Sequence, residues 1–170
     1  MKRHPSLHAL SEHHHHALVQ ALQIKRLAGR PAAEREKHAR QTAREFLRFW
    51  RRAGRKHFRE EEEILLPAYS RRVPLRTDAA VVRMLSEHGA IRARIDELGR
   101  LLAAGQPVEG PLRALGLELH AHVRLEENEV FPRIEAALGE DELRRLHLSR
   151  LYSAPTTRRK RTLKTKKKKG

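Results

Sequence analysis

Two segments of the chain repeat one pattern of histidine and carboxylate side chains. HFREEEEILLP (residues 57–67) and HVRLEENEVFP (residues 122–132) align without gaps and share the first histidine, an arginine, two glutamates and the closing proline. In each copy a histidine comes four residues before a glutamate: His57 precedes Glu61, and His122 precedes Glu126. Residues four apart lie one above the other on a helix, so each pair can present an imidazole and a carboxylate on one face.

Both pairs lie on the apolar face of a helical pattern. Before the first pair, apolar residues recur every three or four positions, at Ala39, Ala43, Phe46, Trp50 and Ala53. A histidine and a carboxylate that point into a core are costly to bury unless their charge and hydrogen-bonding groups are compensated. One such pair alone would favour an ordinary ion pair or a core histidine. Two ungapped copies, each in register with its stripe, favour a bound metal ion.

Two further inward histidines are expected on the helices that lack the repeat. His88 lies on the apolar stripe of the third predicted helix, between Met84 and Ile91. The apolar offsets around His88 also fit His14, which makes His14 the first candidate in the run of four histidines at positions 13–16. His15 is the second candidate, because Leu18 and Leu22 would share its face; His13 and His16 are expected to face solvent or to support the ligands.

The candidate ligands are four imidazoles and two carboxylates: His14 (or His15), His57, Glu61, His88, His122 and Glu126. If each carboxylate bridges two cations, the set supplies about eight coordination positions. Two six-coordinate ions have about twelve positions, so a bridging oxide or hydroxide leaves about two open for a small molecule. Imidazole and carboxylate donors do not choose sharply among iron, manganese and zinc.

Other polar residues near the repeat are expected to lie off the ligand face. Glu60 and Glu63 are expected to be solvated at the helix end, so that Glu60→Ala would change neither metal content nor stability. Glu62 and Glu127 recur in both copies and are candidates to hydrogen-bond the ligand imidazoles. His120 is two positions from His122 and should point away from it.

The apolar periodicity predicts four long helices and no strand. They span about residues 6–28, 31–67, 78–104 and 111–132, with Pro67 ending the second, and a short fifth amphipathic helix follows over about 140–152. The predicted fold class is all-α: an antiparallel up-and-down four-helix bundle with a short fifth C-terminal helix and a disordered basic tail.

The composition fits one domain, expected over residues 1–152, followed by a tail over residues 153–170. The chain has 170 residues, no cysteine and a formal net charge of +16. The absence of cysteine excludes disulfides, thiolate metal sites and iron–sulfur clusters. No run is long enough to span a membrane and the N-terminus lacks a secretory signal, so a cytoplasmic protein is expected.

The tail carries nine lysines and arginines and no acidic residue, which leaves 16 − 9 = +7 for the domain. Such a segment is either a solvated extension or a weak, non-specific ligand of nucleic acid or an anionic surface. It has no aromatic side chain after Tyr152 for base stacking, so sequence specificity is not expected.

In their order along the chain, these motifs resemble the hemerythrin-like, HHE cation-binding family, over roughly residues 6–150. The resemblance is carried by EHHHHAL, HFREEEEILLP, SEHGAIR and HVRLEENEVFP. It implies a four-helix bundle around a non-haem di-iron centre. It also implies the roles of the ligands: His57 and His122 are terminal, Glu61 and Glu126 bridge, and His88 and His14 complete the pair of irons.

The sequence differs at one position from the oxygen-carrying members of the family it resembles. Those members have a fifth histidine one helical turn after the histidine of the third helix. Here that position is Arg92. The expected function is therefore to bind, sense or reduce dioxygen, nitric oxide or peroxide rather than to carry oxygen. The alternatives are an iron-handling protein that delivers or repairs iron centres of partner proteins under nitrosative or oxidative stress, and a nucleic-acid-binding protein with a purely structural bundle.

Overall fold

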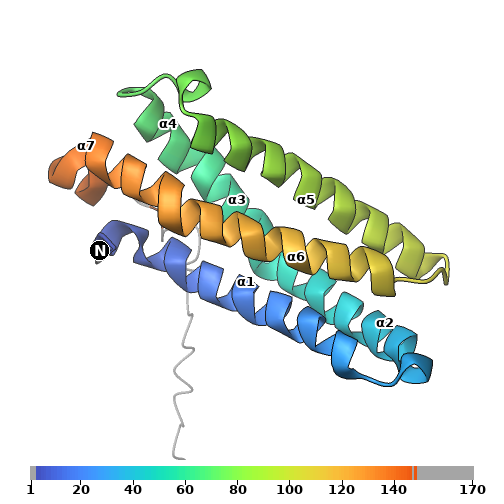
Figure 1. Ribbon diagram of the computed structural model, residues 1–170. Coiled ribbons are helices and arrows are strands. Elements are labelled where there is room, and N and C mark those ends of the chain that lie inside the picture. Colours follow the sequence, from blue (N-terminus) through green and yellow to red (C-terminus); the bar gives the residue numbers. More distant parts are fainter. Residues whose placement is uncertain (1–2, 147, 149–170) are drawn as a thin grey trace, which may run out of the picture.

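The computed structural model describes residues 3–146 and Leu148, and these residues form four long helical rods (Figure 1). The first rod is α1 (His8–Arg26), flanked by 3-10 turns at Pro5–Leu7 and Leu27–Gly29. The third is α5 (Ala79–Ala103), which follows a 3-10 turn at Leu75–Thr77. No strand occurs in this part of the chain, which confirms the predicted all-α class.

The second and fourth rods are each built from several segments. The second rod runs through α2 (Ala32–Phe49), a π turn (Trp50–Gly54), α3 (Arg55–Glu60), a second π turn (Glu61–Leu65) and α4 (Leu66–Ser70). The fourth runs through α6 (Glu109–Leu125), a π turn (Glu126–Val130) and α7 (Phe131–Arg145). The α1–α2 and α5–α6 connections lie at one end of the bundle, and α7 and the α4–α5 connection at the other (Figure 1).

The prediction that Pro67 ends the second helix is wrong, because the helix continues to Ser70. Pro67 and Pro132 each lie in the first turn of the segment that follows a π turn. A proline is tolerated there because the first turn of a helical segment needs no intrahelical N–H from that residue. The π turn therefore accommodates a residue that would otherwise break the rod.

The fourth rod bends where the sequence places Gly139. This glycine has φ +69°, a left-handed conformation that L side chains rarely adopt, and residues 140–145 return to helical geometry. Residues 140–145 thus form a helical segment beyond the kink at Gly139, where the short fifth helix was expected to begin. The remainder of the expected fifth helix, apart from Leu146 and Leu148, and the whole basic tail lie outside the described residues.

A layer of histidines and glutamates divides the hydrophobic core into two clusters. One cluster contains Leu10, Leu65, Met84 and Val130, and the other contains Ala17, Phe58, Ile91 and Val123. In each rod the two clusters are separated by candidate ligands: His14 lies between Leu10 and Ala17, and His88 lies between Met84 and Ile91. All four rods therefore contribute to one polar layer in the middle of the bundle.

None of the described helices combines the length and hydrophobicity needed to cross a lipid bilayer.

Candidate metal centre

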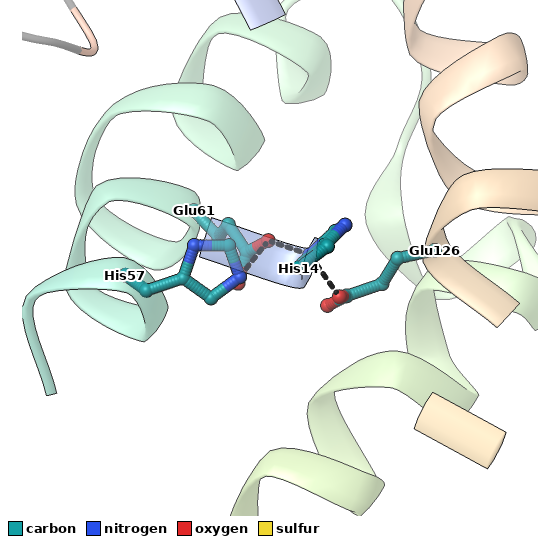
Figure 2. A group of neighbouring side chains, drawn as sticks. All are labelled: His14, His57, Glu61 and Glu126. Atoms are coloured by element: carbon teal, nitrogen blue, oxygen red, sulfur yellow. Dashed lines mark ion pairs between the residues drawn. The ribbon is translucent and has the colours of Figure 1, made fainter. Parts of the chain in front are cut away.

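Six of the seven candidate ligands meet in this polar layer. All six are nearly inaccessible to solvent, with exposed fractions of 0–6%: His14, His57, Glu61, His88, His122 and Glu126. Figure 2 shows four of these side chains converging from the first, second and fourth rods. The seventh candidate, His15, is exposed on α1 and belongs to neither group of converging ligand atoms, so the structure places His14 at the centre instead.

Each carboxylate divides its two oxygens between two pairs of imidazoles. Glu61 Oε1 lies 3.3 Å from His57 Nε2 and 3.8 Å from His14 Nε2, whereas Glu61 Oε2 lies 3.4 Å from His88 Nε2. One oxygen thus faces the His14–His57 pair and the other faces the third rod. This is the orientation that a bridging carboxylate requires.

Glu126 repeats the arrangement from the opposite side. Its Oε2 lies 2.9 Å from His14 Nε2, and its Oε1 lies 2.9 Å from His122 Nε2 and 3.3 Å from His88 Nε2. The donor atoms consequently fall into two groups that could each hold a cation: His14, His57, Glu61 and Glu126 form one, and His88, His122 and Glu126 form the other. The two groups share Glu126.

Both carboxylates begin a π turn. The π turns at Glu61–Leu65 and Glu126–Val130 occupy equivalent positions of the sequence repeat. A π turn adds a residue to the helical turn and is common at functional sites. The repeat therefore encodes a local backbone geometry as well as two ligands.

Several of these buried donor atoms lie close to one another without forming a hydrogen bond. The Nε2 atoms of His14, His57 and His122, both Glu61 oxygens and Glu126 Oε2 are buried and have no hydrogen bond. Buried polar atoms are rarely left unsatisfied, and imidazole nitrogens and carboxylate oxygens are the donors that iron, manganese and zinc accept. The residues present fit a pair of divalent cations.

Electrostatics within the layer also favour added positive charge. Burial raises the pKa of Glu61, but His57, His14 and His88 outweigh burial and hold this pKa below its usual value. Burial lowers the pKa of His88, but Glu126 and Glu61 outweigh it and raise the pKa to about 10. The anionic carboxylates therefore hold protons on neighbouring imidazoles, in the positions where metal cations would otherwise balance the charge.

Three outer carboxylates orient three of the four imidazoles. Each ring donates a hydrogen bond from Nδ1–H. His14 donates to Glu127 at 2.6 Å, His88 donates to Glu62 at 2.7 Å, and His122 donates to Glu87 at 3.0 Å. Such a bond fixes the ring and directs the Nε2 lone pair toward the metal. The predicted support from Glu62 and Glu127 is thus present, whereas Glu87 lies outside the repeat and was not predicted.

Each of the three outer carboxylates is in turn held by an arginine. Arg3 lies 2.7 Å from Glu127, Arg92 lies 2.8 Å from Glu62, and Arg83 lies 2.8 Å from Glu87. His88 and then Arg92 hold the pKa of Glu62 below its ordinary value, so Glu62 accepts these bonds as an anion. Arginine, glutamate and histidine form three chains that run from the surface to the centre.

His57 is the exception among the four imidazoles. Its Nδ1 is buried and has no hydrogen-bond partner, and burial lowers its pKa to about 4, so the ring is neutral near pH 7. The ring packs edge-on against His14, with centroids 4.7 Å apart, and against His13, with centroids 5.6 Å apart. His13 is half-buried beside the ligands, and His16 is exposed.

An apolar cavity of about 20 Å³ adjoins His57. Its walls include the candidate ligands His14, His57 and His122 and are completed mainly by apolar side chains, among them Ala17, Phe46, Trp50 and Leu119. Gly54 also lines it: a Cβ there would lie 2.1 Å from Trp50 Cε3, so the tryptophan ring can cover this backbone only because residue 54 is glycine. A space of this size holds one molecule about as large as water.

The expectation that Glu60 is solvated is wrong. Its side chain is fully buried, neither oxygen has a hydrogen-bond partner, and burial, followed by repulsion from Glu61, raises its pKa to about 7. Glu63 is exposed and pairs with Arg59, as expected for a solvated residue. The helical wheel places Glu60 off the ligand face, but the side chain is nevertheless buried.

Glu60→Gln is expected to stabilise the metal-free protein at pH 8 and to change it little at pH 5. Glu60 ionises at about pH 7 in the folded protein but near pH 4.5 in the unfolded chain. The destabilisation caused by ionising the buried carboxyl therefore grows between these two pH values and reaches its maximum above pH 7. Thermal unfolding at both pH values measures the effect, with Glu63→Gln as the exposed control. An equal shift of the midpoint at both pH values would rule out this account of Glu60.

Glu62→Gln is expected to weaken metal binding by roughly 10- to 100-fold, because the neutral amide supports the His88 ring less well than an anion does. Competition between the protein and a chromophoric chelator for Mn²⁺ or Zn²⁺ measures the affinity. Glu63→Gln removes the neighbouring charge without touching an imidazole and should leave the affinity unchanged. Equal losses in the two variants would show that general charge, and not ring orientation, is responsible.

Comparisons with known proteins identify a family but no individual relative. The model of the family described as Hemerythrin HHE cation binding domain matches residues 6–147. No curated protein and no solved structure matches the chain. The matched region covers most of the 170 residues and contains all six converging ligands. The chain therefore belongs to the hemerythrin HHE cation-binding domain family.

Proposed function

We propose that the polar layer holds two non-haem iron ions and binds a small molecule such as dioxygen, nitric oxide or peroxide, which the protein senses or reduces. The observation that carries the proposal is the division of each carboxylate between two pairs of imidazoles. Family membership favours iron, although the same donors would accept manganese or zinc.

The residues of each rod have defined tasks in this proposal. His14 and His57 would hold one ion, His88 and His122 the other, and Glu61 and Glu126 would bridge them. When bound, ferrous iron supplies electrons and coordination positions that the protein donors leave open. The surrounding leucine, phenylalanine and tryptophan side chains exclude bulk water, which strengthens every charge interaction at the centre.

The apolar cavity supports a small ligand of low polarity. The cavity touches both imidazoles of the first pair and one of the second, and aromatic rings, among them Phe46 and Trp50, form part of its walls. A diatomic gas or a peroxide is comparable to water in size, whereas a larger substrate would not fit without movement of Trp50 or Phe46. The cavity thus supports a gas or peroxide as the ligand.

The surroundings of Arg92 support ligand sensing or reduction over reversible oxygen carriage. Its guanidinium donates to Glu62 and lies 5.1 Å from the centroid of the Phe58 ring, which in turn stacks on His88 with centroids 3.6 Å apart. The described contacts of Arg92 thus reach the centre through Glu62 and Phe58. The centre has four histidines, with none at the position of the fifth.

Glu61→Ala or Glu126→Ala is expected to reduce the iron content from about two ions per chain to fewer than one. Each change removes one carboxylate oxygen from each of the two proposed iron positions. The protein is loaded anaerobically with ferrous iron, desalted and analysed for metal. Exposure of the unchanged chain to air should then give the near-ultraviolet absorption of a bridged ferric pair. Glu63→Ala is the control and should retain both ions.

Two results would contradict the di-iron proposal. One is binding of a single zinc ion per chain with no uptake of iron. The other is equal iron content in Glu61→Ala and Glu63→Ala, which would show that the buried carboxylate does not bind metal.

Ala17→Leu is expected to weaken nitric oxide binding to the iron-loaded protein at least tenfold while the iron content is retained, since the larger side chain fills the cavity. Optical titration with nitric oxide measures the binding. Ala21→Leu, one turn further along α1 and also buried but outside the cavity, is the matched control. Equal weakening in both variants would show that overpacking of α1, and not loss of the cavity, is the cause.

A further inference from the structure

The second rod has opposite chemistry on its two faces. Its inner face is buried and includes Ala39, Ala43, Phe46, Trp50 and His57. Its outer face carries five exposed cations at intervals of seven, four, three and four residues: Lys37, Arg44, Arg48, Arg51 and Arg55. This spacing keeps all five on one side of the helix, and we refer to these five residues as the basic stripe.

Acidic residues do not neutralise the basic stripe. Within the described residues, none of its five side chains makes an ion pair or a side-chain hydrogen bond, whereas Arg35, Arg40 and Arg59 on the flanks of the same rod all pair with glutamates. Glu45 is the one acidic residue between positions 37 and 59 of the sequence, and its carboxylate accepts a bond from Gln41. The stripe therefore presents its charge to solvent.

The dimensions of the stripe suit an extended polyanion. Lys37 and Arg55 are 18 positions apart in the sequence. This corresponds to roughly 27 Å of helix at about 1.5 Å per residue. A rod with a cation at almost every turn can follow a row of phosphates and release their condensed counterions. Arginine is well suited to this contact because its planar guanidinium binds phosphate through two N–H groups.

We propose that the basic stripe binds the phosphate backbone of double-stranded nucleic acid without sequence specificity. This proposal concerns the folded bundle and does not depend on the metal centre.

Other anionic partners fit the stripe less well. Proteins that bind single strands stack bases on exposed aromatic rings, but Phe46, Trp50 and Phe58 of this rod are buried and Phe49 is partly buried. A stable protein interface has an apolar centre, and the large exposed apolar residues lie on other rods, at Val19, Leu22, Val82 and Leu117. A helix at a lipid surface needs an apolar face for the bilayer, and this rod's apolar face already lies in the core.

The test compares two variants of the full chain that lose the same charge. The stripe variant is Arg44→Gln, Arg48→Gln, Arg51→Gln and Arg55→Gln together. The control variant is Arg76→Gln, Arg100→Gln, Arg113→Gln and Arg124→Gln, four exposed arginines that lie elsewhere and also make no ion pair within the described region. Circular dichroism and thermal unfolding verify that both variants fold, since all eight side chains are exposed and glutamine suits a helix.

Fluorescence anisotropy with a short labelled DNA duplex, at salt concentrations of roughly 50 to 200 mM, measures binding. The stripe variant should bind at least tenfold more weakly than the control variant. The slope of log affinity against log salt should become shallower by about 3 to 4, as expected for four lost phosphate contacts. The control variant should keep the slope of the unchanged chain.

Three outcomes would overturn the proposal. The first is equal affinity of the stripe and control variants, which would mean that net charge or another segment governs binding. The second is the absence of duplex binding by the unchanged chain at the lowest salt. The third is loss of binding to phosphatidylserine vesicles, but not to DNA, in the stripe variant, which would identify a lipid surface as the partner.

Discussion

Glu61 and Glu126 lie fully buried in the middle of an apolar bundle, and most of the surrounding structure serves to make this burial tolerable. Removing one carboxylate from water costs several kcal/mol, and two close together repel each other. Four imidazoles surround the two side chains, and in the metal-free protein two of them, His14 and His88, balance the charge by retaining protons. A pair of cations would balance the same charge more completely and would also satisfy the unpaired ring nitrogens.

The outer polar groups follow from the same constraint. An imidazole can direct Nε2 at a shared point only if its ring is held, and Glu127, Glu62 and Glu87 hold three of the rings. These outer carboxylates would repel the inner ones if they were unpaired, but each is bound to an arginine. Each chain has the same order from the surface inward: a cationic arginine, an anionic glutamate and an imidazole.

The convergence of the six candidate side chains could be predicted from the sequence because each interrupts an apolar stripe. Stripe offsets ranked His14 before His15, and the ungapped repeat indicated Glu61 and Glu126. The π turns could not be predicted, since they depend on hydrogen bonds that residue types do not reveal, and Pro67 therefore seemed to end a helix that it does not end. Glu87 was missed because it belongs to no repeat, and it reaches His122 only through the packing of α5 against α6.

Glu60 shows a related limit of sequence reasoning. A helical wheel distinguishes the ligand face from the opposite face, but it does not show how far neighbouring rods wrap around the flanks. The all-α class, the apolar faces and the central polar layer depend on local periodicity and were predictable. Burial of a flanking carboxylate depends on the angles at which the rods pack, which periodicity does not determine.

The three arginines that end the polar chains differ in their contact with solvent: 17% of the side chain is exposed for Arg3, 39% for Arg92 and 58% for Arg83. Dissolved ions screen exposed pairs more strongly than sheltered ones. Ionic strength should therefore weaken the support of His122 most, that of His88 less and that of His14 least. His57 is not connected to an arginine through an outer carboxylate. Bulk electrolyte thus affects the two halves of the centre unequally.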